Sequence, residues 1–136
     1  MKNFVPRLIA LALLVFTLPM LAHAGADFVP YKTGIVKSAI SKGETTLLFF
    51  KSTYRGTCAR QDRVLQKLRA SYPKYNKSIT FVLIDWDTYK THDVTTSRSI
   101  PRRSTMVLIK GGKEVKRLVA QTSEQKIKAL LDSAVR

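Results

Sequence analysis

The chain has 136 residues, of which 24 are Lys or Arg and 9 are Asp or Glu, so its formal net charge is +15. This length suits one compact domain and excludes two full-sized ones, and a single cysteine excludes an internal disulfide. The positive charge exceeds what solubility needs. It predicts attraction to an acidic protein or to a polyanion such as nucleic acid, anionic lipid or polysaccharide, unless the chain is a generally basic exported protein.

Residues 1–24 have the pattern of a secretory signal peptide. Two basic residues precede an apolar run from residue 8 to 18, and small residues lie around a cleavage site at Ala24. The alternative is an uncleaved membrane anchor, but the run is shorter than the about 20 residues that span a bilayer. We therefore expect a single mature domain, residues 25–136, with 22 basic and 9 acidic residues, no membrane span, and a location in the periplasm or outside the cell.

The mature chain alternates helix-like and strand-like segments. Apolar residues at helical spacing predict helices at 35–41, between Cys58 and Pro73, and over the last residues from 123. Continuous or β-branched apolar runs predict strands at 45–51, 79–85, 105–109 and 113–119, and residues 91–98 form a short helix or an irregular crossover. Two glycines between the last two strands predict a hairpin turn. This order favours a mixed α/β sheet with helices on both faces.

Two finer predictions concern individual side chains. On the helix after Cys58, Arg69 falls on the polar face, away from the apolar stripe. Thr122 is expected to cap the last helix, with Gln125 as its reciprocal partner three residues on.

The only cysteine lies where the strand at 45–51 leads through a short turn into a helix. Backbone N–H groups at a helix N-terminus are free, and the helix dipole favours anions there, thiolates included. Cys58 is therefore placed for thiol chemistry or for anion binding.

The junction resembles the active site of the thioredoxin superfamily, whose motif is W-C-G-P-C. In the segment Y-R-G-T-C, Tyr54 stands for the Trp, Gly56 matches, and Cys58 falls on the second, resolving cysteine. Arg55 stands at the first, nucleophilic cysteine. The resemblance continues through residues 81–87 and 105–118, and it implies a thioredoxin-like fold with a central mixed sheet of four to five strands.

The same resemblance implies that the catalytic apparatus is missing. Thiol exchange needs an attacking and a resolving sulfur, and Arg55 cannot attack. The buried Asp and the Lys that assist proton transfer in thioredoxins correspond to Phe49 and Leu83. The family's cis-proline corresponds to Ser104, unless the loop carries an insertion and Pro101 keeps that role.

The sequence leaves open the state of Cys58 and the role of the nearby arginines. Cys58 is either buried and inert, or a reactive single thiol whose pKa is lowered by Arg55, Arg60 and the helix dipole. In the second case it can form a glutathione adduct, a disulfide with a partner or a disulfide-linked dimer. Arg55, Arg102 and Arg103 form an anion site or are solvated. The residues expected to line a binding groove are Tyr54, Gly56, Thr57, Arg103, Ser104 and Thr105.

Other motifs carry weaker signals. His92 and Asp93 lie in a polar loop far along the chain from Cys58, which favours a surface histidine, and Asp85 and Asp87 suit capping better than metal binding. We expect no metal or cofactor. Aromatic residues interleave with basic ones, but most fall on core faces, and export argues against nucleic acid as a partner.

The leading hypothesis is a non-catalytic accessory module of the cell envelope that binds an extended peptide or partner protein. The alternatives are a single-thiol oxidoreductase that acts through Cys58 mixed disulfides, and an electrostatic binder of envelope polyanions. Replacing Cys58 abolishes only the second activity. Strong salt dependence distinguishes the third.

Overall fold

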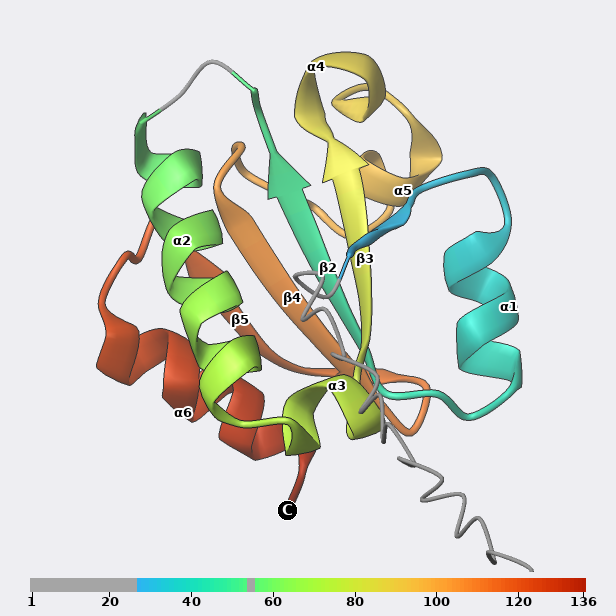
Figure 1. The fold of residues 1–136 in the computed structure, drawn as a ribbon. Helices are drawn as coiled ribbons and strands as arrows, with labels where there is room; N and C mark the ends of the chain where they lie inside the picture. The colour runs from blue at the N-terminus through green and yellow to red at the C-terminus, as the bar shows by residue number, and fades with distance from the viewer. Residues whose placement is uncertain (1–26, 54–55) are drawn as a thin grey trace, which may run out of the picture.

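A computed structural model describes residues 27–53 and 56–136, which form a five-stranded sheet between two layers of helices (Figure 1). The strands and helices follow one another in the order β1 (Val29–Pro30), α1 (Ile35–Ser41), β2 (Thr46–Lys51), α2 (Gly56–Ser71), α3 (Lys74–Ser78), β3 (Thr80–Asp85), α4 (Trp86–Tyr89), α5 (Asp93–Thr96), β4 (Thr105–Lys110), β5 (Lys113–Val119) and α6 (Glu124–Ala134).

The sheet is mixed, with the strand order β1-β3-β2-β4-β5. β3 runs parallel to both β1 and β2, while β2 and β5 run antiparallel to β4. The central strand β2 pairs along its length with β3 on one side and β4 on the other. Its carboxyl end leads towards α2, so the strand-to-helix junction lies at the middle of the sheet rather than at an edge.

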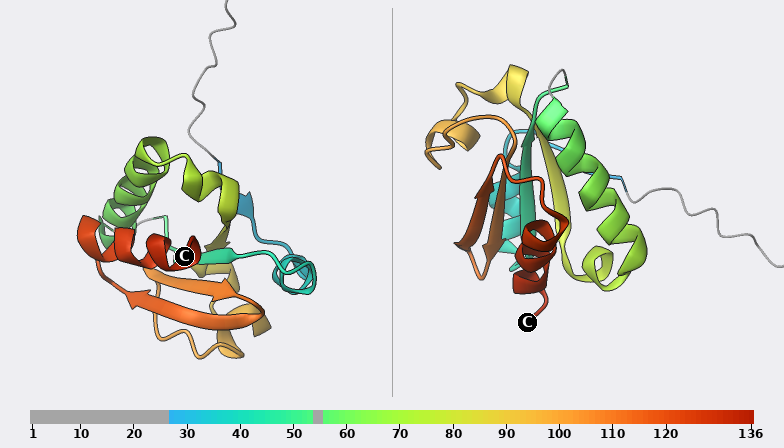
Figure 2. Two further views of the ribbon diagram at one scale, coloured as in Figure 1. Left: turned by 90° about the horizontal axis from the view of Figure 1, so that it is seen from below. Right: turned by 90° about the vertical axis from the view of Figure 1, so that its left-hand side faces the viewer.

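Each face of the sheet carries its own apolar cluster, because successive side chains of a strand point to opposite faces. Leu47 and Phe49 of β2 pack under α2, α3 and α6, whereas Leu48 and Phe50 pack under α1 and α5. Figure 2 shows the two helix layers on opposite sides of the sheet. The fold predicted from the sequence, a mixed sheet with helices on both faces, is confirmed.

Glycines stand where the backbone needs a positive φ. Gly111 and Gly112 have φ of +61° and +75° and form the two-residue turn between β4 and β5. These angles are those of a type I′ turn, which matches the twist of the strands it joins. Gly43 has φ of +71° just after α1, the left-handed conformation with which many helices end. Both features agree with the sequence prediction.

Several details differ from the sequence prediction. β1 and α3 were not expected, since two and five residues are too few to show a period. Ser123, not Thr122, caps α6: the Ser123 hydroxyl accepts a hydrogen bond from the Lys126 N–H at 3.4 Å. The helix begins one residue later than its pattern indicated.

Arg69 is the largest correction, because it is buried at 4% exposure instead of lying on a solvated face. Its guanidinium carbon lies 3.9 Å from the ring centre of Phe81 and 5.1 Å from that of Phe28. Its Nε donates to Asn76 Oδ1 at 2.7 Å. Aromatic faces and an amide oxygen replace water around this cation, which helical spacing alone does not reveal.

The predicted signal peptide, residues 1–24, lies outside the described residues. Within 27–53 and 56–136, no helix has the length and apolar character needed to cross a bilayer.

Candidate functional site

Cys58 is the third residue of α2 and is fully buried, with 0% exposure. Its sulfur is hydrogen-bonded to the Ser104 hydroxyl, and the Ser52 backbone N–H donates to the same sulfur at 3.5 Å. Ser52 follows the end of β2 and Ser104 precedes β4. The thiol is therefore held between the ends of two neighbouring strands and the first turn of α2.

Ser104 is the residue beside the thiol, and it has an unusual backbone. Its φ is +60°, and its N–H and C=O are both used internally: the N–H donates to Phe50 O at 2.7 Å, and the C=O accepts from Ala120 N–H at 2.8 Å. Pro101 is exposed, and none of the peptide bonds described in this structure is cis. The sequence left Ser104 and Pro101 as alternatives for the position that corresponds to the cis-proline of thioredoxins. Of the two, Ser104 lies next to Cys58.

Gln61 completes a buried polar network that sequence reasoning missed. It is fully buried, and its Nε2 donates to Ser104 O at 2.9 Å and to Gln121 O at 3.0 Å. One signal was available: Gln61 lies three residues after Cys58 and four before Leu65, on the apolar face of α2. A polar residue at such a position is usually satisfied by a specific partner.

Apolar side chains occupy the two positions that correspond to the proton-transferring Asp and Lys of thioredoxins. Phe49 and Leu83 are register partners on β2 and β3, and both belong to the apolar cluster under α2. Phe49 is fully buried. The tertiary structure therefore brings together the two positions that the sequence comparison singled out, and neither side chain can accept or donate a proton.

The predicted binding groove is described only in part, because Tyr54 and Arg55 lie outside the described residues. Gly56 is exposed and Thr57 is half-buried at the start of α2. In the loop before β4, Arg102 is exposed and Arg103 is half-buried. Thr105 is buried, and its hydroxyl donates to Arg102 O at 2.7 Å, which fixes the loop from inside.

The acidic side chains near this end of the sheet have internal partners. Asp85 caps α4 through its contact with the Asp87 N–H at 3.3 Å, and Asp87 accepts from the Ser52 hydroxyl at 2.8 Å. Asp62 of α2 is paired with Lys51 of β2. Across the described part of the chain, no group of three His, Cys, Asp or Glu is placed to hold a metal ion.

This arrangement permits little thiol chemistry in the folded state. A sulfur attacks only when another sulfur or electrophile reaches it in line, and Cys58 has no exposed surface and is hydrogen-bonded to Ser52 and Ser104. The neighbouring hydroxyl and amide hold the sulfur in place. The chain has no second cysteine that could resolve a mixed disulfide.

Comparison with solved structures identifies close matches of shape. A thioredoxin-like protein, Trxlp from Edwardsiella tarda EIB202, superposes with a TM-score of 0.66 at 27% identity, covering 79% of this chain and 97% of the other. Oxidised thioredoxin from Plasmodium falciparum gives 0.63 at 20% identity, with coverage of 79% and 97%. Thioredoxin O2 from Arabidopsis thaliana gives 0.63 at 20% identity, with coverage of 80% and 95%.

A search of curated proteins finds no match. The thioredoxin family model matches residues 30–133, which include every strand and helix from α1 to β5 and nearly all of α6. Because that match spans most of the chain and the fold agrees with it, the chain belongs to the thioredoxin family, in which it is a member with one cysteine, fully buried.

Proposed function

We propose that this protein is exported, to a periplasm or outside the cell, and serves there as a non-catalytic binding module of the cell envelope. Its partner is an extended peptide or a protein segment that docks near the start of α2 and the loop before β4. The observation that carries the proposal is the state of Cys58: the only thiol of the chain is fully buried and hydrogen-bonded to Ser104.

The hydrogen bonds of the loop suggest how a peptide is held. Ser104 uses both backbone groups internally, and the Arg102 carbonyl is occupied by the Thr105 hydroxyl. Within the described residues, the backbone N–H and C=O of Arg103 make no hydrogen bond. Extended peptides commonly bind by pairing with such free backbone groups. Arg103 is therefore the residue beside which we place the peptide backbone.

Charge supports an acidic partner. Arg102 is exposed, Arg103 is half-buried, and Arg60 is exposed on the first part of α2. None of the three forms an ion pair in the described part of the structure. Complementary charge raises the rate at which an acidic segment finds this surface and disfavours basic competitors.

The experiment is capture of partners by the mature protein, without reductant, from an envelope extract of its source cell. Four forms are compared, of which three are the unmodified chain, Cys58→Ser, and the double variant Arg102→Gln with Arg103→Gln. Lys113→Gln with Lys116→Gln removes the same charge from exposed positions on β5 and is the matched control. We expect Cys58→Ser and the control to retain the partner and the double arginine variant to lose it.

Two other results identify the alternatives. A partner or glutathione that is attached through a disulfide, and is lost with Cys58→Ser, establishes a single-thiol oxidoreductase and refutes the binding module. Binding that weakens equally with either double variant, and falls steeply as salt is raised, indicates nonspecific attraction to polyanions.

A further inference from the structure

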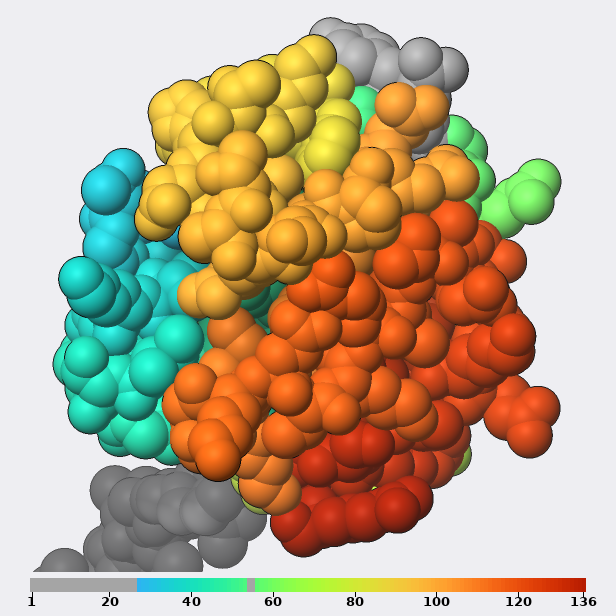
Figure 3. All heavy atoms as spheres, turned by 180° about the vertical axis from the view of Figure 1, so that it is seen from behind, coloured from blue at the N-terminus to red at the C-terminus, as the bar shows by residue number. Residues whose placement is uncertain are grey.

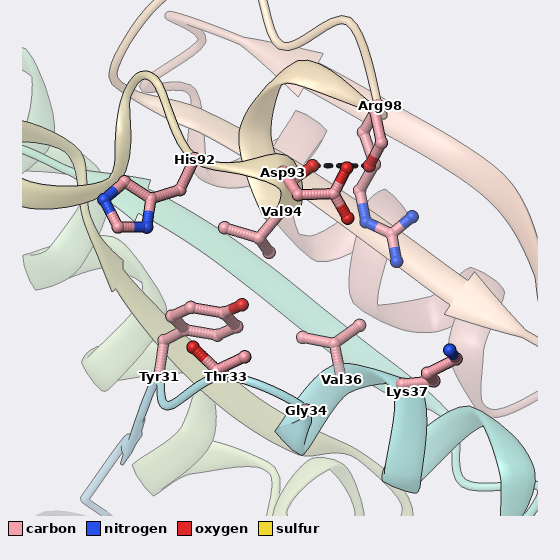
Figure 4. A pocket seen from close by; sticks show the side chains of 10 residues that line it. Tyr31, Thr33, Gly34, Val36, Lys37, His92, Asp93, Val94 and Arg98 are labelled. Carbon is pink, nitrogen blue, oxygen red and sulfur yellow. Dashed lines mark hydrogen bonds between the residues drawn. The ribbon is translucent and has the colours of Figure 1, made fainter.

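A cavity of about 320 Å³ lies on the sheet face opposite α2 and α6, between α1 and the segment that contains α5 (Figure 4). We call it the α1–α5 cavity. In the view from behind, the surface is hollowed where the α1 segment approaches this segment (Figure 3). The volume is at the small end of the range for ligand sites. We propose that the cavity binds a small organic anion, with a carboxylate or phosphate head and a short apolar body.

Two cations occupy one end of the cavity. Lys37 of α1 and Arg98, which follows α5, both line it and are drawn on the same side in Figure 4. Neither side chain forms a hydrogen bond or an ion pair with any other described residue. The Arg98 Nε is buried and lacks a partner in this part of the chain. A buried donor without an acceptor is destabilising, and an oxyanion between the two cations supplies that acceptor.

The negative side chains nearby do not neutralise this end. Glu114 attracts Arg98, but both of its carboxylate oxygens already accept hydrogen bonds from Arg117, at 2.6 and 2.8 Å. Asp93 also lines the cavity and makes no ion pair within the described ranges. Counting Lys37 and Arg98 against Asp93 leaves one positive charge in excess, without a contribution from His92.

The rest of the cavity suits an apolar body. Val36 and Val94 lie in the middle, and the Tyr31 ring lies towards the end away from the cations, with His92 above it (Figure 4). Tyr31 is held edge-on by Tyr89, with ring centres 4.8 Å apart. A ligand that places its head between the cations and its body over the valines satisfies both parts of the cavity at once.

The wall that carries Arg98 is fixed by hydrogen bonds. Arg117 of β5 donates to the Arg98 carbonyl at 2.8 Å and to the Ser99 carbonyl at 3.1 Å. Inside the segment, the Thr95 hydroxyl donates to Tyr89 O at 2.7 Å. These bonds hold the backbone at Arg98 in place before a ligand arrives, which reduces the ordering needed on binding.

The test uses the isotopically labelled mature protein and phenyl phosphate as the probe, followed by the NMR shifts of the Gly34 and Val94 amides. We expect saturable shifts with a dissociation constant in about the millimolar range, as for a small ligand of moderate efficiency. Phenylacetate, inorganic phosphate and benzyl alcohol are titrated alongside. Binding by both aromatic anions establishes the shared oxyanion chemistry, and their ratio shows which head is preferred.

Substitutions then test where in the cavity the anionic head of the ligand binds. Lys37→Gln and Arg98→Gln should each weaken binding about tenfold, the loss of one charge-assisted hydrogen bond. Lys42→Gln removes an exposed charge just after the same helix and should change little. If Arg98→Gln disturbs folding, Lys37→Gln alone still tests whether the cations bind the anionic head. The proposal is refuted if phenyl phosphate gives no saturable shifts, if benzyl alcohol binds as tightly, or if Lys42→Gln weakens binding as much as Lys37→Gln.

Discussion

Burial of Cys58 makes a quantitative prediction about its reactivity: a thiol reagent reaches the sulfur only when the domain opens. Cys58 has 0% exposure and belongs to the first turn of α2. If global unfolding controls access and the domain has at least about 5 kcal/mol of stability, the native thiol reacts about a thousandfold or more slowly than in the denatured chain. The rate should then follow the unfolding equilibrium of the whole domain.

Core substitutions on a different helix test this. Leu130 and Ile127 lie on α6 and are fully buried in the cluster beneath it. Leu130→Ala should lower the free energy of unfolding by about 3 kcal/mol, and Ile127→Val by about 1 kcal/mol. Since 1.4 kcal/mol is a factor of ten, the reaction should accelerate by about 100-fold and about 5-fold, respectively.

The assay follows the reaction of a chromogenic disulfide reagent with Cys58 and measures urea unfolding of the same variants. Val115→Ala, at a side chain that is 50% exposed on β5, is the control and should change neither quantity. The reasoning is refuted if the native chain reacts at the rate of the denatured one. It is also refuted if Leu130→Ala lowers stability as calculated and leaves the reaction rate unchanged, because the sulfur would then be reached by local opening of α2.

Three further predictions concern stability and processing. Burial, and then the hydrogen bond to Asp132, raise the pKa of Tyr75 from 10.0 to about 12. The stability that this raised pKa provides is complete below pH 10 and is lost as the pH rises towards 12. The thermal unfolding midpoint of the unmodified chain should therefore fall between pH 10 and pH 12, and Tyr75→Phe should make that fall smaller. Gly43→Ala should lower the unfolding free energy by about 1 kcal/mol because φ is +71°, whereas Gly56→Ala, with open space and no positive φ, should be neutral. If residues 1–24 are a signal peptide, as we propose, N-terminal sequencing of the protein isolated from its source cell should begin at Gly25, and an intact Met1 would contradict that proposal.

The regular elements were largely predictable because their patterns are local. The run at β2 and the glycine pair after β4 appear in consecutive residues, so periodicity and turn chemistry identify them without knowledge of the fold. β1 was missed for the opposite reason. Its two residues form a strand only because β3 lies beside them.

The resemblance to thioredoxins singled out individual residues of the predicted site but could not show whether each is buried. Correspondence with the thioredoxin motif located Cys58, Ser104, Phe49 and Leu83, and the register of β2 and β3 places the last two opposite one another. Arg69 shows why the burial of a side chain could not be predicted from the sequence. Helical spacing put it on a polar face, yet Phe81 and Asn76, from segments later in the chain, enclose it.

By itself, the sequence determined that the chain alternates strands and helices and that it cannot complete a dithiol cycle alone, because it has one cysteine. Only the tertiary structure decided that this sulfur is fully buried, since its cover comes from Ser104, 46 residues away, and that Gln61 spans 60 residues to reach Gln121. It likewise brought Lys37 and Arg98 to one cavity. Periodicity reflects neighbours along the chain, whereas burial and charge clustering depend on which distant segments pack together.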